Sequence, residues 1–195
     1  MNNQKISVFR KVCMVAGIGL VVAGAAVMIL WQWGIGHSQQ KMAGCVQTLR
    51  TLLPEPQGAV LESRSDNTMA VLSLDGTDYV GILEMPRFGS ALPVGAQWGK
   101  LTRHPCQLDG SIYDGSMQVG GTTQKGQYDF YREISVGDSV YFTDMEGNRY
   151  GYTVTGMRYA QHADQTALQR EEADLTLFVK NVYAFEYLII FCNVM

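Results

Sequence analysis

The stretch Ser139-Val-Tyr-Phe-Thr-Asp-Met-Glu-Gly-Asn-Arg-Tyr-Gly-Tyr-Thr-Val-Thr155 has the pattern of a β-hairpin and indicates the fold class of this 195-residue chain. Its two runs, Ser139–Thr143 and Arg149–Thr155, are rich in β-branched and aromatic residues, as strands are. Between them, Asp144–Asn148 carries the Gly-Asn pair of a compact turn. The hairpin therefore predicts a mainly β domain around it.

Further strand-like runs lie on both sides of this hairpin. A short strand is expected near Met69–Leu74, and longer ones at the ranges Tyr79–Met85, Ala91–Val94, Leu175–Val179 and Tyr187–Cys192. Asp164–Glu172 is charged and is expected to be a helical or loop excursion. Several short strands separated by turn signals, in a chain with 21 Gly, predict an all-β barrel or sandwich.

Composition argues against two classes of partner. The formal net charge of −3 provides no basic surface for nucleic acid. The three histidines, His37, His104 and His162, lack the spacing of metal ligands, and no C-x-x-C pair is present. We therefore expect no nucleic acid, no metal and no cofactor.

An uncharged apolar stretch near the N-terminus, Val12–Trp33, is long enough to cross a bilayer core of about 30 Å as a helix. Lys5, Arg10 and Lys11 precede it, and the next cation is Lys41. By the positive-inside rule, residues 1–11 are cytoplasmic, 12–33 span the cell membrane once, and the remainder is extracellular. The alternative is a cleaved signal peptide, although the apolar run is longer than a typical signal core.

The segment 34–77 is expected to hold a juxtamembrane helix and a connector. Apolar residues at helical spacing from His37 to Leu53 predict an amphipathic helix that packs on the following domain, and Pro54 ends it. The alternative is a helix lying on the membrane surface, but its polar face is not strongly basic.

From Asp78 to Cys192 the chain resembles the sortases, especially the class-B-like sortases of Gram-positive bacteria. The resemblance is carried, in order, by Tyr79–Pro86 with Leu92–Val94, by His104–Cys106, Gly110–Tyr113 and Met117–Thr122, by Val136–Asn148 with Tyr150–Val154, and by Asp174–Phe178. It implies that residues 78–195 form a sortase-like eight-stranded β-barrel with short helices, preceded by one transmembrane helix.

The resemblance also implies where a sortase would carry its chemistry. A sortase cleaves a Thr-Gly bond in a sorting signal through a cysteine thiolate, with a histidine for proton transfer and an arginine for the oxyanion. Those three positions fall on Thr122, Lys180 and Tyr187, although the first could slip by one residue to Gly121. A hydroxyl, an ammonium and a phenol cannot perform thioester chemistry, so we expect a degenerate binding groove rather than transpeptidation.

Two alternative hypotheses assign reactive roles to other residues of the domain. Thr122 and Lys180 would be neighbours and could form a hydroxyl–lysine dyad; otherwise Lys180 is solvated or paired with Glu186. Cys106 and Cys192 match non-catalytic cysteine positions of the resemblance, and a disulfide between them is an open hypothesis in an oxidising compartment. His104 near Cys106 looks like a dyad, but a pair separated by one residue need not converge.

The function expected from the sequence is that of a membrane-anchored pseudo-sortase. Its groove would bind a sorting-signal-like peptide, a cell-envelope component or an active sortase. The alternatives are an active transpeptidase or hydrolase with relocated residues, and a scaffold that assembles through the anchor or the helix 37–53.

Overall fold

The computed structural model describes residues 3–55, 57–58, 67–97, 104–161 and 173–195. The chain divides into two structural units, Met1–Ser38 and Gln39–Met195. The predicted excursion Asp164–Glu172 lies outside the described residues.

A single helix, α1 (Asn3–Leu52), occupies the N-terminal quarter of the chain. The helices predicted before and after residue 34 are therefore one continuous helix, which ends two residues before Pro54 as expected. Among the side chains that the structure describes, no helix is both long enough and apolar enough to cross a membrane. The predicted span Val12–Trp33 lies partly outside those side chains and stays a prediction.

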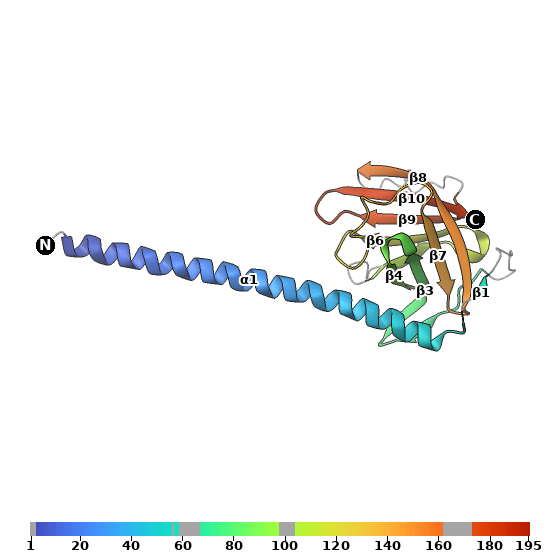
Figure 1. Ribbon diagram of the computed structural model, residues 1–195, viewed down its shortest axis with the longest axis horizontal. Helices are drawn as coiled ribbons and strands as arrows, with labels where there is room; N and C mark the ends of the chain where they lie inside the picture. The colour runs from blue at the N-terminus through green and yellow to red at the C-terminus, as the bar shows by residue number, and fades with distance from the viewer. Residues whose placement is uncertain (1–2, 56, 59–66, 98–103, 162–172) are drawn as a thin grey trace. The chain divides into compact units, whose positions relative to one another are not determined.

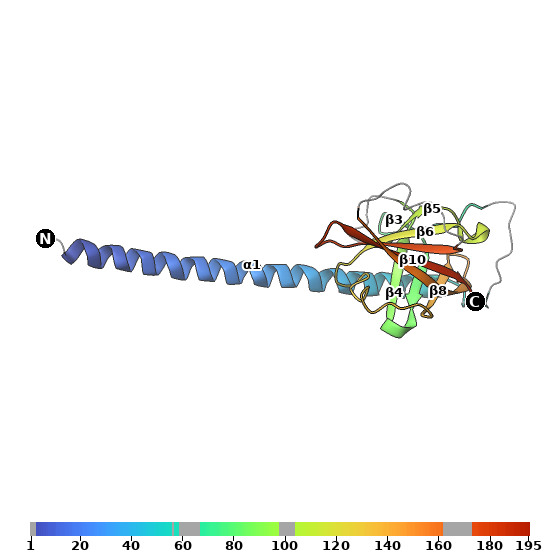
Figure 2. The same cartoon turned by 90° about the horizontal axis from the view of Figure 1, so that it is seen from above.

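The second unit is a closed β-barrel, shown in two orientations in Figures 1 and 2. Eight strands pair around the ring in the order β3, β4, β5, β6, β9, β10, β8, β7 and back to β3. Their bounds are β3 (Thr77–Met85), β4 (Ser90–Gly95), β5 (Cys106–Asp109), β6 (Met117–Thr122), β7 (Ser139–Asp144), β8 (Asn148–Gln161), β9 (Leu175–Lys180) and β10 (Glu186–Val194). This confirms the predicted eight-stranded barrel.

Four smaller elements complete the barrel unit. The short strands β1 (Gln57–Gly58) and β2 (Leu72–Leu74) pair with β8 and β3 outside the ring. Two 3-10 helices, η1 (Pro86–Phe88) and η2 (Ile112–Asp114), connect strands, in agreement with the short helices that were predicted.

The predicted hairpin is the antiparallel pair β7–β8, and one carboxylate organises its turn. Asp144 Oδ1 accepts hydrogen bonds from the amides of Glu146 (2.9 Å) and Asn148 (2.8 Å). Gly147 has φ +87°, a backbone conformation that residues with a Cβ rarely adopt. The Asp-x-x-Gly-Asn sequence thus closes the hairpin as its turn chemistry predicted.

Alternating side chains divide β9 and β10 between two apolar clusters. Leu177, Val179, Leu188 and Ile190 belong to the main core inside the barrel. The intervening residues Phe178, Ile189 and Phe191 form a second, smaller cluster. Because strand side chains alternate between faces, this second cluster lies on the outer face of the same strands.

The last part of α1 belongs to the barrel unit. Val46 and Leu49 are buried and pack with Tyr79 and Ile82 of β3. Arg50 forms an ion pair with Glu84, and Arg149 adds a second one at 3.1 Å. The helix packs on the domain as expected, and the second unit, Gln39–Met195, includes this part of the helix.

Candidate functional site

The three positions singled out by the resemblance lie side by side on adjacent strands. Thr122, the last residue of β6, is the parallel partner of Lys180, the last residue of β9. Tyr187 of β10 is the antiparallel partner of the same Lys180. Register partners point to one face of a sheet, so all three share the outer face that carries Phe178 and Ile189.

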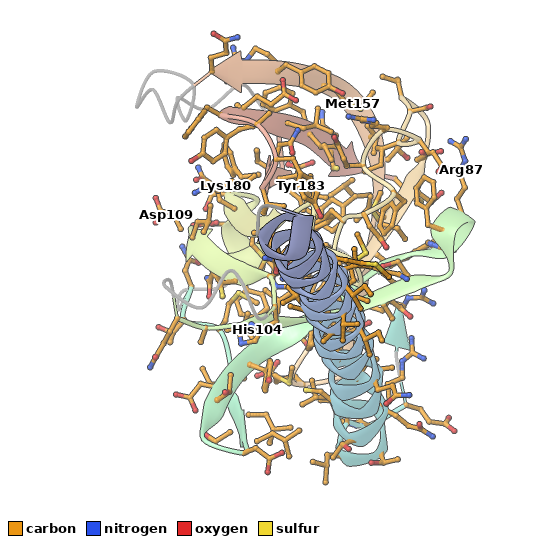
Figure 3. All side chains as sticks on the ribbon, turned by 90° about the vertical axis from the view of Figure 1, so that its left-hand side faces the viewer. Arg87, His104, Asp109, Met157, Lys180 and Tyr183 are labelled. Carbon is orange, nitrogen blue, oxygen red and sulfur yellow. The ribbon has the colours of Figure 1, made fainter. Side chains whose placement is uncertain are left out.

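A cavity of about 580 Å³ lies at this end of β9 and β10. It is lined by Lys180, Tyr187 and the residues of the connecting loop, Asn181–Glu186. Tyr183 and Phe185 are 80% and 91% exposed, so these rings do not fill the cavity. Figure 3 shows Lys180 and Tyr183 at the end of the barrel that faces the viewer.

Asn181 holds the base of this loop. Its Nδ2 donates to Glu186 Oε1 at 2.8 Å, and its Oδ1 accepts from the Tyr183 amide at 3.0 Å. The amide of Val182 donates to Thr123 Oγ1 at 3.2 Å, which ties the loop to the residue after β6. Asn181 and Thr123 are each 5% exposed, so these bonds are sheltered from water.

Thr122 and Lys180 differ in their access to the cavity. Thr122 is 2% exposed, and its Oγ1 already accepts from the Gln124 amide at 3.4 Å. Lys180 is exposed, and its ammonium group is solvated. A lysine that activates a hydroxyl is desolvated in its site, so this arrangement does not favour the Thr122–Lys180 dyad.

Of the two simple alternatives for Lys180, an ion pair with Glu186 is absent from the described contacts, and the side chain is exposed. Glu186 accepts from Asn181 instead. Lys180 therefore brings a solvated cation to the cavity wall, and Tyr187 brings a half-buried ring.

The side chains of His104 and Cys106, whose convergence the sequence left open, meet in the structure. Cys106 Sγ lies 3.6 Å from His104 Nδ1, with His104 in a bend two residues before the first residue of β5. Both side chains are buried, at 5% and 0% exposure, and the His104 ring packs on Gly95 and Tyr79. A substrate cannot reach this sulfur unless the barrel opens.

The hypothetical disulfide between Cys106 and Cys192 is not formed in the structure. Burial raises the pKa of the Cys192 thiol to about 12. A thiol with a raised pKa is a poor nucleophile near neutral pH. Among the described residues, no three His, Cys, Asp or Glu side chains gather as a metal site would require.

The residues that shape the loop were not found from the sequence. Asn181, Thr123 and Gln127 are buried polar residues whose bonds fix the ends of β6 and β9. The only local signal was an asparagine directly after a strand, where Asn often closes a turn through its own side chain.

This closed barrel, with an outward-facing site at the ends of β6, β9 and β10, is a sortase-like fold. Among solved structures, sortase A from Corynebacterium diphtheriae matches at 16% identity and a TM-score of 0.53, over 61% of this chain and 61% of that one. Sortase C1 from Streptococcus suis matches at 17% and 0.51, over 60% and 73%. Sortase C1 from Streptococcus agalactiae matches at 20% and 0.52, over 63% and 70%.

These likenesses concern the fold alone. The chain spans 61% of the length of the Corynebacterium sortase A. No protein-family model matches the chain, and no curated protein matches it. The class-B-like resemblance stays a prediction, since the three structures named above are sortases A and C1.

Proposed function

We propose that this protein is a membrane-anchored, extracytoplasmic pseudo-sortase that binds a peptide or another cell-envelope partner without cleaving it. One observation carries the proposal. The three positions where the resemblance places His, Cys and Arg are neighbours in register, and they hold Thr122, Lys180 and Tyr187. The site geometry of the fold is kept while the groups for acyl transfer are replaced.

Binding does not need those groups. A peptide can be held by shape, apolar contact and a few hydrogen bonds in a cavity of this size. Sorting-signal-like peptides are the first ligands to test, since the solved structures with this fold are sortases.

The anchor is supported by the first unit. Val12–Trp33 is uncharged and lies within α1. Its described side chains face outward without partners in the chain; Leu20, for example, is 76% exposed. Apolar side chains exposed in this way are stable in lipid rather than in water. The proposed topology has residues 1–11 in the cytoplasm and the barrel outside.

The test uses the full chain in nanodiscs and a fluorescent sorting-signal peptide that contains a Thr-Gly bond. We expect saturable binding by anisotropy and no cleavage by mass spectrometry. Lys180→Ala and Tyr187→Ala should each weaken binding by about 1 kcal/mol, roughly five-fold. Arg87→Gln changes another exposed cation, placed far from Lys180 in Figure 3, and should leave binding unchanged.

Turnover with a covalent acyl intermediate would refute the inactive assignment. The site of that adduct would then identify the chemistry. An ester on Thr122 would support the hydroxyl–lysine alternative. A thioester on Cys106 would support the second candidate function, a relocated cysteine enzyme, which only the 3.6 Å contact between His104 and Cys106 favours.

A further inference from the structure

The loop between β9 and β10 carries an unusual exposed aromatic tip. Its outer residues are Val182, Tyr183, Ala184 and Phe185, and none of them is charged. Tyr183 and Phe185 are 80% and 91% exposed, which leaves about 300 Å² of aromatic surface in water. Soluble proteins rarely expose such rings together unless the surface has a partner.

The tip is held out rigidly. Asn181 binds Glu186 and the Tyr183 amide, and the Val182 amide binds Thr123. The Thr123 amide in turn donates to Lys180 O at 3.0 Å. Because the base of the loop is fixed by these bonds, the two rings are presented outward and do not fold back on the barrel.

The position of the tip indicates its partner. Within the unit Gln39–Met195, the β9–β10 loop and the N-terminal end of the helix segment Gln39–Leu52 lie at the same end (Figures 1 and 2). That helix end leads, through only six residues, to Trp33 at the end of the apolar stretch. Six residues reach at most about 20 Å even when fully extended. If the stretch spans a bilayer, the helix end at Gln39 therefore lies within about 20 Å of the end of that span.

We propose that Tyr183 and Phe185 insert into the headgroup region of the membrane in which the chain is anchored. This inference rests on the proposed anchor. Aromatic rings favour the membrane–water interface, where the ring body meets lipid and the Tyr hydroxyl meets water. Insertion holds the cavity beside the tip, which Lys180 and Tyr187 line, directly at the membrane surface.

The charges around the tip predict whether its insertion requires anionic lipid. Among the residues that line the cavity beside the tip, Lys180 and Glu186 carry charge, one positive and one negative. With no net positive charge, binding does not depend on anionic lipid. Insertion therefore occurs equally in vesicles of phosphatidylcholine alone and in vesicles with added phosphatidylglycerol.

The experiment is photolabelling of the full chain in vesicles that contain a phosphatidylcholine with a diazirine near the glycerol backbone. Trypsin cuts after Lys180 and releases the peptide Asn181–Met195, whose labelling is measured by mass spectrometry. We expect labelling of this peptide and of the apolar stretch. The double variant Tyr183→Ser/Phe185→Ser lowers the labelling of Asn181–Met195 about ten-fold. Val136→Ser, which alters another exposed apolar side chain, leaves it unchanged.

The outcomes separate this inference from the anchor. Labelling of the apolar stretch without labelling of Asn181–Met195 overturns the tip contact and leaves the proposed function intact. Labelling of neither segment overturns both. Equal labelling of Asn181–Met195 in the double variant and in the original chain also overturns the role of the two rings. Circular dichroism of each variant confirms that the barrel is folded.

Discussion

Asn181 is the residue on which the shape of the cavity depends most directly. It is 5% exposed, and it both donates to Glu186 and accepts from the Tyr183 amide. Asn181→Ala would leave a sheltered amide and a carboxylate without these partners. We expect a loss of about 1–2 kcal/mol in the free energy of unfolding, measured by urea denaturation. Peptide affinity should fall as well.

A matched variant separates the two bonds of Asn181. Glu186→Gln keeps an acceptor for Asn181 Nδ2 but removes the charge, and should cost less than Asn181→Ala. If Asn181→Ala had no effect on stability or on peptide affinity, the loop would not depend on this side chain.

The buried thiol of Cys192 predicts how the free energy of unfolding changes at alkaline pH. Burial raises the pKa of its thiol from 9.0 to about 12, so the folded chain keeps a proton that the unfolded chain loses above pH 9. The stabilisation is complete below pH 9 and is lost as pH rises from 9 toward 12, by up to about 1.4 kcal/mol per pH unit. Denaturant titrations at several pH values should show a shallower decline in Cys192→Ala. Equal slopes in both chains would contradict the assignment.

At the residue scale, the sequence predicted which residues belong to the candidate site better than it predicted which side chains touch each other. Thr122, Lys180 and Tyr187 were found by resemblance, and strand register then placed them together. The contact between His104 and Cys106 was left open, because it depends on the bend at His104, which the sequence did not predict. Asn181 could not be predicted, because its role depends on contacts with Glu186 and the Tyr183 amide within the loop.

At the scale of elements, the helix segment Gln39–Leu52 contributes to the stability of the barrel. Leu49 is fully buried with Val46, Tyr79 and Ile82. Leu49→Ala should lower the free energy of unfolding by about 2–4 kcal/mol, because a cavity remains in a packed cluster. Thermal and urea unfolding of the full chain would measure this.

The neighbouring Gln47 provides the control for Leu49. It is exposed on the same helix, so Gln47→Ala should change stability by less than about 0.5 kcal/mol. Equal effects of the two substitutions would mean that the helix does not pack on the barrel.

Alternation and runs of β-branched and aromatic residues predicted β3, β4 and β7–β10, but neither β5 nor β6. The strand β6, Met117–Thr122, contains Gly120 and Gly121, which weaken a strand pattern. A Cβ at Gly120 would lie 2.6 Å from Leu108, and one at Gly121 would lie 2.4 Å from Tyr128. Tertiary packing imposes both glycines, so local propensity could not indicate a strand there. Only the resemblance placed this segment in the barrel.

At the scale of the whole molecule, the proposed topology predicts a protease-protection pattern. Protease added to intact protoplasts should digest the barrel and leave the N-terminal residues protected inside. The reason is the cation bias of Lys5, Arg10 and Lys11 before the apolar stretch. N-terminal sequencing of the mature chain addresses the signal-peptide alternative, since a start after residue 33 would contradict the anchor.

The closed barrel was predicted as a complete fold from the resemblance. The pattern of the individual strands did not predict it. Eight short strands cannot be ordered by their periodicity, because parallel pairs such as β6–β9 join segments far apart in the chain. The ordered motifs of the resemblance supplied that connectivity, and the ring of eight strands agrees with it.

The burial of Thr122 bears on whether such a chain can regain lost chemistry. The residue is 2% exposed, and its amide is held by Gln127 while its carbonyl accepts from the Tyr128 amide. An imidazole is larger than a threonine side chain, and overfilling a packed site costs about 1–3 kcal/mol. The triple variant Thr122→His/Lys180→Cys/Tyr187→Arg should therefore remain inert in a peptide-cleavage assay. Peptide cleavage would also require changes in the loop that follows β6, so substitutions at these three positions alone would not be sufficient.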